Sequence, residues 1–531
     1  MPGEEAQRPE RIRAAEVAAA LCLATDLGTG LPFEHGLHST LTAMRLGQRL
    51  GVDRETAAQT YYACLLTYSG CTADAEITAE TFGGSMVTHY APVMFGSERE
   101  QLAGIVRALA TPGRPAPVRA IQIARRLPRA ARERDPHLAA ICEVAQMLSE
   151  RLGLPKPVGD LFIHLTERWD GKGYLRRATG EEIPLPLRIT HVARDATLHR
   201  MLGGDELAVR IVRKRAGNAF DPQVASCFAD AAEEIFPPVH AAPAWDETLA
   251  REPQPALTLE GEAIDRALAA IGDFADLVSP YLAGHSAGVA ELAGAAAHRC
   301  RIDAAGATTI RRAAYVHDLG RVAVHPGIWQ KPGQLTPDEW EQVRLHPYHT
   351  ERILSRSLFL SALAPVAGAH HERLDGSGYH RGSAGAELAF PARLLAAADV
   401  YHAMTEPRPH RDPVAPEQAA EKLGREASAG RLDADAVAAV VEAAGQRVPR
   451  VERPAGLTER EVEVVAMLAR GRQTKQVARA LGISVKTADR HIQNAYRKIG
   501  VSTRAGATLF AMEHGLVAWG ELPIARPAAR S

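Results

Sequence analysis

The chain has 531 residues and a formal net charge of −1 at pH 7. This length suffices for about three domains of ~100–200 residues, which excludes a single small domain, and the near-zero charge gives no global indication of nucleic-acid or membrane binding. The six cysteines form no CxxC pair, so neither a disulfide framework nor a thiolate metal site is predicted.

The N-terminal segment and the hydropathy predict a cytoplasmic protein. The chain begins MPGEEAQRPERIRAAEV, with acidic residues where a secretory signal needs positive charge and then an apolar run. No uninterrupted apolar stretch approaches membrane-spanning length. We therefore expect no membrane partner.

Apolar residues recur at helical spacing, as at Ala419, Leu423 and Ala427, and aromatic residues make up only 5% of the chain. The predicted fold is therefore all-α. Breaks rich in proline and glycine at 236–255 and 448–454 separate three blocks. We predict domains at residues 1–246, 247–447 and 455–520, followed by a disordered tail at 521–531.

An internal repeat relates the first two blocks. Residues 167–174 read ERWDGKGY and residues 372–379 read ERLDGSGY, so the copies share ER-x-DG-x-GY. Further matched pairs are His38-Ser39 with His285-Ser286 and Gly70 with Gly320. One lobe is therefore predicted to be a duplicate of the other.

The second block concentrates imidazole and carboxylate side chains. Seven of those between positions 285 and 399 are candidate metal ligands, namely His285, His317, Asp318, His346, His370, His371 and Asp399. Nitrogen and oxygen ligands together favour iron, manganese or zinc over calcium, which prefers oxygen cages. Seven ligands are too many for one tetrahedral ion, so we predict a cluster of two or three metals sharing a bridging carboxylate. Such sites usually hydrolyse phosphate esters.

The first block lacks most of these ligands. Our alignment places Thr67 and Tyr68 opposite His317 and Asp318, Ile141 opposite His346, and Leu165-Thr166 opposite His370-His371. Only His38 and, with a one-residue gap, Asp195 are retained. Two ligands cannot hold a cluster. The first lobe is therefore predicted to be metal-free and to serve as a scaffold, a dimerisation surface or a ligand sensor.

Four stretches of the second block are distinctive: HDLGRVAV (317–324), KPGQLTPDEWEQVRLHP (331–347), HHERLDGSGY (370–379) and RLLAAADVYHAM (393–404). In order and spacing they resemble the HD-GYP branch of the HD-domain phosphohydrolases. The resemblance implies an all-helical fold, iron or manganese ions, and hydrolysis of cyclic di-GMP. It also implies that the seven residues ligate the metals and that Asp318 bridges two ions. Two ions is the default, with Asp276 or Glu262 as candidate acidic ligands for a third.

Bound cations lower the pKa of water from about 15.7 to ~7, which gives a nucleophile at neutral pH. Ligating histidines must be neutral, so activity should fall in acid. Arg321 follows His317 by four residues, hence one helical turn along on the same face, where it could hold a phosphate oxygen. Asp318 and Arg321 are the predicted catalytic residues, although lysine is usual in the family at the latter position.

The loop from Asp375 matches the family's signature at Gly376, Gly378 and Tyr379, which makes these four residues the predicted substrate loop. Its two glycines allow close backbone approach to a ligand or partner. The chain departs from the family at His380, where the motif normally ends in proline, and at Ala287-Gly288, where arginines are common.

The segment from Leu457 to Val517 carries ten Lys/Arg against five Asp/Glu. Thr458 and Glu461 predict a capping box, Gly471 and Gly482 a helix end and a turn, and Ser484 the cap of a helix running to about Ile499. The segment LTEREVEVVAMLARGRQTKQVARALGISVKTADRHIQNAYRKIG resembles a LuxR-type helix-turn-helix, which implies a four-helix domain that binds DNA.

In this motif the second helix of the pair enters the major groove. Its candidate base-facing residues are Lys486, Thr487, Asp489, Arg490 and Asn494. Candidate phosphate contacts are Lys475, Arg497, Lys498 and Arg504. Residues expected to pack inward are Val485, Ala488, Ile492 and Ile499. Such modules work as dimers on paired half-sites, so we expect a homodimer, formed through residues 508–512 or through the N-terminal lobe.

Together these features predict a phosphodiesterase of a cyclic dinucleotide combined with a regulator that binds promoter DNA. One alternative is a ligand-responsive transcription factor whose HD lobe binds a nucleotide without turning it over. Another is a hydrolase of a different nucleotide phosphate ester.

Overall fold

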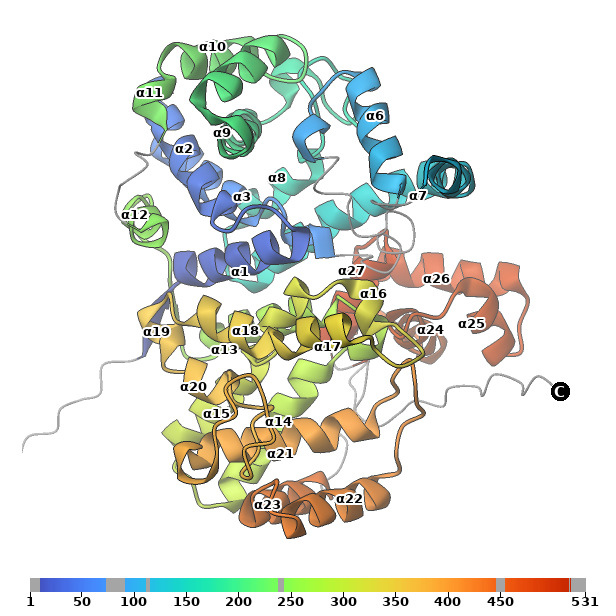
Figure 1. Cartoon of the computed structure of the whole chain (residues 1–531). Helices are drawn as coiled ribbons and strands as arrows, with labels where there is room; N and C mark the ends of the chain where they lie inside the picture. Colours follow the sequence, from blue (N-terminus) through green and yellow to red (C-terminus); the bar gives the residue numbers. More distant parts are fainter. Residues whose placement is uncertain are drawn as a thin grey trace, which may run out of the picture. The chain divides into compact units, whose positions relative to one another are not determined.

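The computed structural model describes residues 10–72, 91–110, 115–236, 243–445, 454–514 and 516. Within these ranges the chain is helical apart from one sheet of two short strands, so the predicted all-α class is confirmed (Figure 1). No helix there is both long and apolar enough to cross a bilayer. The predicted disordered tail at 521–531 lies outside the described residues.

The chain divides into two compact units, Met1–Ala267 and Leu268–Ser531. The elements of the first unit are β1 (Arg11–Arg13), α1 (Ala14–Thr29), α2 (His35–Leu50), α3 (Arg54–Leu66), α6 (Glu98–Leu109), α7 (Ala116–Arg151), α8 (Lys156–Leu161), α9 (Leu185–Arg215), α10 (Pro222–Asp230), α11 (Ala232–Ile235), α12 (Ala244–Ala250) and β2 (Thr258–Glu260). Helix α13 (Glu262–Asp276) spans the division.

The segment after the first proline-rich break belongs, by its contacts, to the first unit. Strand β2 pairs antiparallel with β1 at the start of the chain. The hydroxyl of Tyr61 donates to the carbonyl of Thr248 at 3.0 Å, and that of Tyr62 donates to Glu252 at 2.7 Å. The contact boundary thus lies about twenty residues after the predicted one at 246.

The second unit holds the remaining helices. These are α14 (His285–Arg299), α15 (Ala304–Val316), α16 (Pro326–Trp329), α17 (Pro337–Arg344), α18 (His346–Leu354), α19 (Leu358–Ser361), α20 (Ala364–Ala367), α21 (Phe390–Thr405), α22 (Pro416–Ser428), α23 (Ala434–Ala444), α24 (Glu459–Ala469), α25 (Thr474–Ala480), α26 (Val485–Ile499) and α27 (Arg504–Glu513). Helices α24 to α27 form the predicted four-helix C-terminal domain.

The internal repeat is visible in the packing of both units. A Cβ on Gly70 would lie 2.0 Å from the carbonyl oxygen of Ile141, and one on Gly320 would lie 2.0 Å from that of His346. Only glycine permits this approach, so the same close contact is built twice. Asp26 accepts a hydrogen bond from the backbone nitrogen of Gly36 at the start of α2. Asp276 accepts the equivalent bond from the backbone nitrogen of Ser286 at the start of α14.

Candidate metal centre and DNA-binding domain

Three of the predicted ligands are oriented by their own backbone. Nδ1 of His317, His346 and His370 lies 2.7, 2.6 and 2.6 Å from the carbonyl oxygen of the residue three positions earlier. In the neutral imidazole these hydrogen bonds place the proton on Nδ1 and leave the Nε2 lone pair available. Each Nε2 lies 2.8–3.3 Å from an oxygen of Asp318. All four residues are buried.

The structure brings all seven predicted ligands together in two groups. One group contains Asp318, His346, His370 and His371, and the other contains His285, His317, Asp318 and Asp399. Asp318 belongs to both. Its Oδ1 faces His346 and His370, whereas its Oδ2 faces His285 at 3.4 Å and His317 at 2.8 Å. One carboxylate with an oxygen turned to each group is the arrangement that a bridging ligand requires.

The chemistry of these atoms fits divalent cations. Nε2 of His317, both oxygens of Asp318 and Oδ1 of Asp399 are buried without a hydrogen-bond partner of acceptable geometry. Buried polar atoms are almost always satisfied, and lone pairs of nitrogen and oxygen at such distances repel each other unless a proton or a cation lies between them. The mixed nitrogen and oxygen set suits iron, manganese or zinc.

Before metal binds, protons and ion pairs stabilise the site. Burial opposes the charged form of His317, but Asp318 and Asp399 outweigh it and raise the pKa of His317 to about 9. Burial likewise opposes ionisation of Asp318, yet Arg321 and His317 hold its pKa well below the usual range. For His346 burial prevails and lowers the pKa to about 4. His317 is therefore protonated at pH 7, whereas His346 is already neutral.

Loading of Mn²⁺ is expected to release protons at pH 7. His317 must lose its proton to become a ligand, and because its pKa is raised, the apparent metal affinity should rise with pH up to about 9. Titration calorimetry in two buffers of different ionisation enthalpy measures the number of protons released. Heats that do not depend on the buffer would contradict this protonation state.

Glu406 is a residue of the site that the sequence motifs did not reveal. Its Oε2 lies 2.8 Å from Nδ1 of His285 and 2.9 Å from Arg408, and its Oε1 lies 3.1 Å from His402. A carboxylate on the far nitrogen of a ligating imidazole fixes the ring and raises its basicity. The only sequence signal is an acidic residue one turn after His402, which no motif distinguishes.

Neither candidate for an acidic third-metal ligand lies in a candidate metal group of the described residues. Asp276 accepts hydrogen bonds from the backbone nitrogen and the hydroxyl of Ser286 at 2.8 and 2.9 Å, so it caps α14. The side chain of Glu262 is 95% exposed.

Arg321 lies in the site, but the prediction that it is on the same helix face as His317 is wrong. Helix α15 ends at Val316, and a 3-10 helix follows over Leu319–Ala323, so Arg321 and His317 do not share a helix face. After the helix end, Gly320 packs against the backbone of α18. The guanidinium still arrives beside the carboxylate, with Nη2 2.5 Å from Oδ2 of Asp318, and it lies over the ring of Trp329.

The predicted substrate loop is shaped mainly by contacts within itself. Oδ1 of Asp375 accepts hydrogen bonds from the nitrogen and hydroxyl of Ser377 at 3.0 and 2.6 Å. Gly376 has a left-handed φ of 77°. A Cβ on Gly378 would lie 2.4 Å from Cα of Glu372, so this glycine serves close approach to its own loop.

Tyr379 is the member of that loop that borders the metal ligands. Its ring lies 4.7 Å from the ring of His371 and 6.0 Å from that of Trp340 in α17. Trp340 is 45% exposed. An exposed indole beside a half-buried phenol offers an aromatic face next to the candidate metal ligands.

The C-terminal domain shows the predicted helix caps. Thr458 and Glu461 form a reciprocal capping box at α24, and the hydroxyl of Ser484 accepts from the nitrogen of Thr487 at the start of α26. Gly500 ends α26 in the left-handed region. Helix α25 begins at Thr474 and ends at Ala480.

Most candidate DNA contacts are exposed in this domain. Those with exposed side chains are Lys475, Lys486, Asp489, Arg490, Arg497 and Lys498. Thr487 and Asn494 are half-buried, and Asn494 accepts a hydrogen bond from Arg497. Lys498 is held by Glu461 at 2.7 Å. Its charge is therefore already paired within the domain.

One inward-facing prediction for α26 is wrong. Ala488 and Ile492 are buried and Ile499 packs on the same core, but Val485 is 47% exposed. Val485 is the first residue of the helix, where the preceding turn leaves its side chain uncovered. Val485 is therefore exposed on the same helix as the candidate base-facing residues.

Known families match both functional regions. The profile of the HD domain family matches residues 115–224 and 270–436, together more than half of the chain. The chain belongs to the HD domain family. Residues 455–511 match the bacterial regulatory proteins of the luxR family. The resemblances drawn from the motifs are thereby confirmed.

The HD lobes also have named relatives. The chain is 28% identical to the 3'3'-cGAMP-specific phosphodiesterase 3 of Vibrio cholerae over 402 residues, 75% of this chain and 87% of the relative. It is 37% identical to a cyclic di-GMP phosphodiesterase of Thermotoga maritima over 28% of this chain and 40% of that protein. The crystal structure of a cyclic GMP-AMP specific phosphodiesterase of V. cholerae covers 82% of this chain and 99% of its own, with a TM-score of 0.57 at 23% identity. That likeness supports the fold.

The first HD lobe has other side chains at positions that match the candidate metal ligands of the second lobe. Helices α2 and α14 begin at His35 and His285, so His35, and not His38, is the counterpart of the first ligand. The ion pairs Arg188–Asp221 and Arg393–Asp433 also correspond. Arg194 follows Arg188 by six residues, and Asp399 follows Arg393 by six. Arg194 is therefore the counterpart of Asp399, and the predicted match of Asp195 with Asp399 is wrong.

Arg194 forms a cation–π contact where the second HD lobe has two acidic candidate ligands, Asp318 and Asp399. Its guanidinium carbon lies 3.9 Å from the ring centroid of Tyr68, the counterpart of Asp318. Arg194 is 3% exposed and, among the described residues, pairs with no carboxylate. All three candidate metal groups of the described residues lie in the second unit.

Proposed function

We propose that the second HD lobe hydrolyses a cyclic dinucleotide at a centre of two iron or manganese ions. The observation that carries this proposal is Asp318, whose two oxygens face separate ligand groups. Ions held there would lower the pKa of water and neutralise the charge of a phosphodiester. Cyclic di-GMP is the first candidate substrate, and 3'3'-cGAMP is the second because a relative over three quarters of the chain is named for it.

The chain's own residues supply the rest of the site. Arg321 lies beside the bridging carboxylate, where its planar fork can hold a non-bridging phosphate oxygen. Tyr379 and the exposed Trp340 provide an aromatic face for a base of the substrate. Nδ1–H groups bonded to carbonyl oxygens keep three imidazoles in the tautomer that binds metal.

The deciding experiment combines elemental analysis and turnover on one anaerobically purified sample. Two or more iron or manganese ions per chain, with linear or fully cleaved product from cyclic di-GMP or 3'3'-cGAMP, would support the proposal. Turnover of a different nucleotide phosphate ester would change the substrate. Bound metal without turnover of any of them would favour a ligand-responsive transcription factor. The complete ligand set argues against that alternative, because a sensor has no chemical need for it.

We further propose that the C-terminal domain binds promoter DNA as part of a cytoplasmic homodimer. The cationic, exposed face of α26 supports DNA binding, and such modules read paired half-sites. Residues 508–512, one predicted dimer surface, are buried within the chain, which favours the N-terminal lobe as the alternative. Equal operator affinity with and without metal and cyclic dinucleotide would exclude coupling between the two activities.

Arg490→Ala is expected to weaken DNA binding about tenfold or more, because a base contact by arginine contributes ~1–3 kcal/mol. Hydrolysis should not change. Lys498→Ala is the matched control, since this lysine is already paired with Glu461 and its loss should cost less affinity. Fluorescence anisotropy with operator DNA at fixed salt measures both. An equal loss for the two variants would mean that Arg490 contributes only charge.

A further inference from the structure

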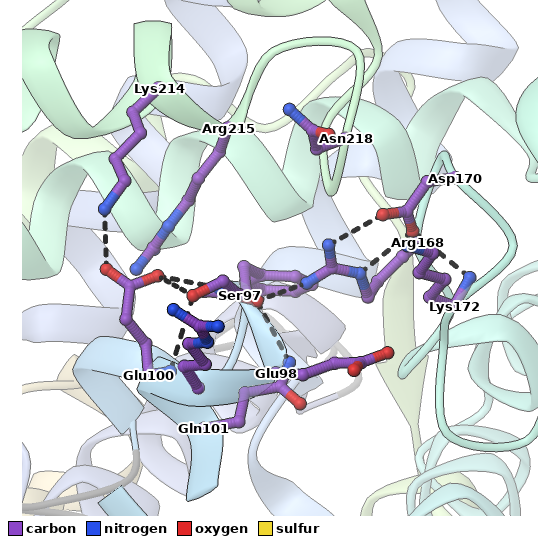
Figure 2. Close-up of a pocket in the computed structure, with 13 residues that line it drawn as sticks. Ser97, Glu98, Glu100, Gln101, Arg168, Asp170, Lys172, Lys214, Arg215 and Asn218 are labelled. Carbon is purple, nitrogen blue, oxygen red and sulfur yellow. Dashed lines mark hydrogen bonds and ion pairs between the residues drawn. The ribbon is translucent and has the colours of Figure 1, made fainter. Parts of the chain in front are cut away.

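The first HD lobe contains a polar pocket of about 430 Å³. Three segments line it: the start of α6, the loop that repeats the substrate loop, and the end of α9 with the turn after it (Figure 2). The side chains of Arg168 and Lys172 come from the loop, and those of Lys214 and Asn218 from the α9 side. The volume lies within the range of about 300–1,000 Å³ that small-molecule sites occupy.

Cationic side chains predominate in this lining. Five are cationic and three are anionic: Arg99, Arg168, Lys172, Lys214 and Arg215 against Glu98, Glu100 and Asp170. Two of the arginines are fixed in place. Arg168 forms two hydrogen bonds with Asp170, at 3.0 and 2.9 Å, and a third with the carbonyl of Gly96 at 2.7 Å. Arg215 is held by Asp195 and by a backbone carbonyl.

Other polar groups of the pocket remain available to a ligand. Arg99 and Lys172 are exposed and form no ion pair within the described ranges. Within the described residues, the amide nitrogen of Asn218 donates one long hydrogen bond, to the carbonyl of Ala216 at 3.4 Å. Lys214 pairs with Glu100 at 2.7 Å, but its side chain is 59% exposed. Anchored arginines beside unpaired cations and an amide suit a phosphate joined to a polar group.

The second HD lobe shows that the fold does not require these cations. In the repeated loop the backbone nitrogen of residue 172 bonds to Asp170, and that of residue 377 bonds to Asp375 in the same way. Lys172 therefore corresponds to Ser377. The left-handed glycines 217 and 430 follow the matching helices, so Lys214 and Arg215 correspond to Ala427 and Ser428. At these three positions the first lobe has a cationic side chain and the second lobe has a small one.

We infer that the first HD lobe binds a phosphate-bearing small molecule of nucleotide size in this pocket. Lys172, Lys214 and Arg99 bind the phosphate, the anchored Arg168 and Arg215 form the wall behind it, and Asn218 binds a polar edge of the ligand. The site is distinct from the metal centre and does not depend on hydrolysis there.

The test uses the full chain with GMP and, separately, inorganic pyrophosphate as probes, read by hydrogen–deuterium exchange. Protection of residues 96–101 and 166–174 is expected with GMP. Lys172→Glu should weaken that protection at least about tenfold, because it replaces an attractive charge by a repulsive one. Lys156→Glu is the matched control, since this exposed lysine of the same lobe lies outside the pocket and should change nothing.

Protection by both probes would assign the binding to the phosphate, and protection by GMP alone would add recognition of the base. Lys172→Ala provides a second variant should the charge reversal unfold the lobe, and it should weaken protection less than Lys172→Glu. The site would be overturned if neither probe changed the exchange of either segment. It would also be overturned if the Lys172 variants were protected as strongly as the unaltered chain.

Discussion

Asp318→Asn is expected to lower turnover of the cyclic dinucleotide at least about 10³-fold and to reduce the metal content of the purified chain. The change keeps the shape of the side chain but removes the charge from the residue that faces both ligand groups. Losing one electrostatic contact to the reacting group costs about 10²–10³ in rate, and here two ions would lose a shared ligand. Turnover and elemental analysis of the same sample measure both effects.

The matched control is Asp338→Asn, because Asp338 is an exposed aspartate in the first turn of α17. It should leave both quantities unchanged. DNA binding should survive Asp318→Asn, since the C-terminal helices have a core of their own. Turnover within about tenfold of the unaltered chain would contradict the bridging role, since such a loss is below that of a single contact. Loss of DNA binding would show that metal loading supports the whole chain.

Arg321→Ala is expected to reduce kcat about 10²–10³-fold, the range for removing one preorganised contact to developing charge. The guanidinium is buried, lies 2.5 Å from Asp318 and is fixed over the ring of Trp329. Because Arg321 is not a metal ligand, metal content should stay close to that of the unaltered chain. Steady-state kinetics with parallel metal analysis separates this residue from Asp318.

Arg321→Lys tests whether charge or shape matters. Lysine keeps the charge but has neither the planar fork nor the same contact with Trp329. We expect turnover within about tenfold of the unaltered chain, because a single charged donor can still hold a phosphate oxygen. A lysine variant as slow as the alanine variant would mean that two-point binding by the guanidinium is essential.

Six of the seven proposed metal ligands stand within the four distinctive stretches of sequence, whereas His285 lies upstream of them. A histidine followed by an aspartate at the end of one helix, and two adjacent histidines before a glycine loop, specify their residues directly. Glu406 could not be found in this way. Its role depends on the turn after α21, which brings the carboxylate to His285, a residue 121 positions earlier.

The register of the repeat was mispredicted for a related reason. His38-Ser39 resembles His285-Ser286 in letters, but the first turn of α2 begins at His35. Residue identity alone favours pairing Asp399 with Asp195, which stands one position after its true counterpart Arg194. Helix starts and repeated ion pairs fix the register in space, and neither is visible in residue identity alone.

The pairing of Arg194 with Tyr68 has a consequence for the newly made chain. The first HD lobe leaves the ribosome first, and in it a guanidinium stacked on a ring stands where the second lobe gathers acids and imidazoles. The second lobe must hold those buried groups together until metal arrives. If the second lobe takes up metal as proposed, chains made without that metal would therefore have a first half that resists proteases and a second half that is more readily cleaved.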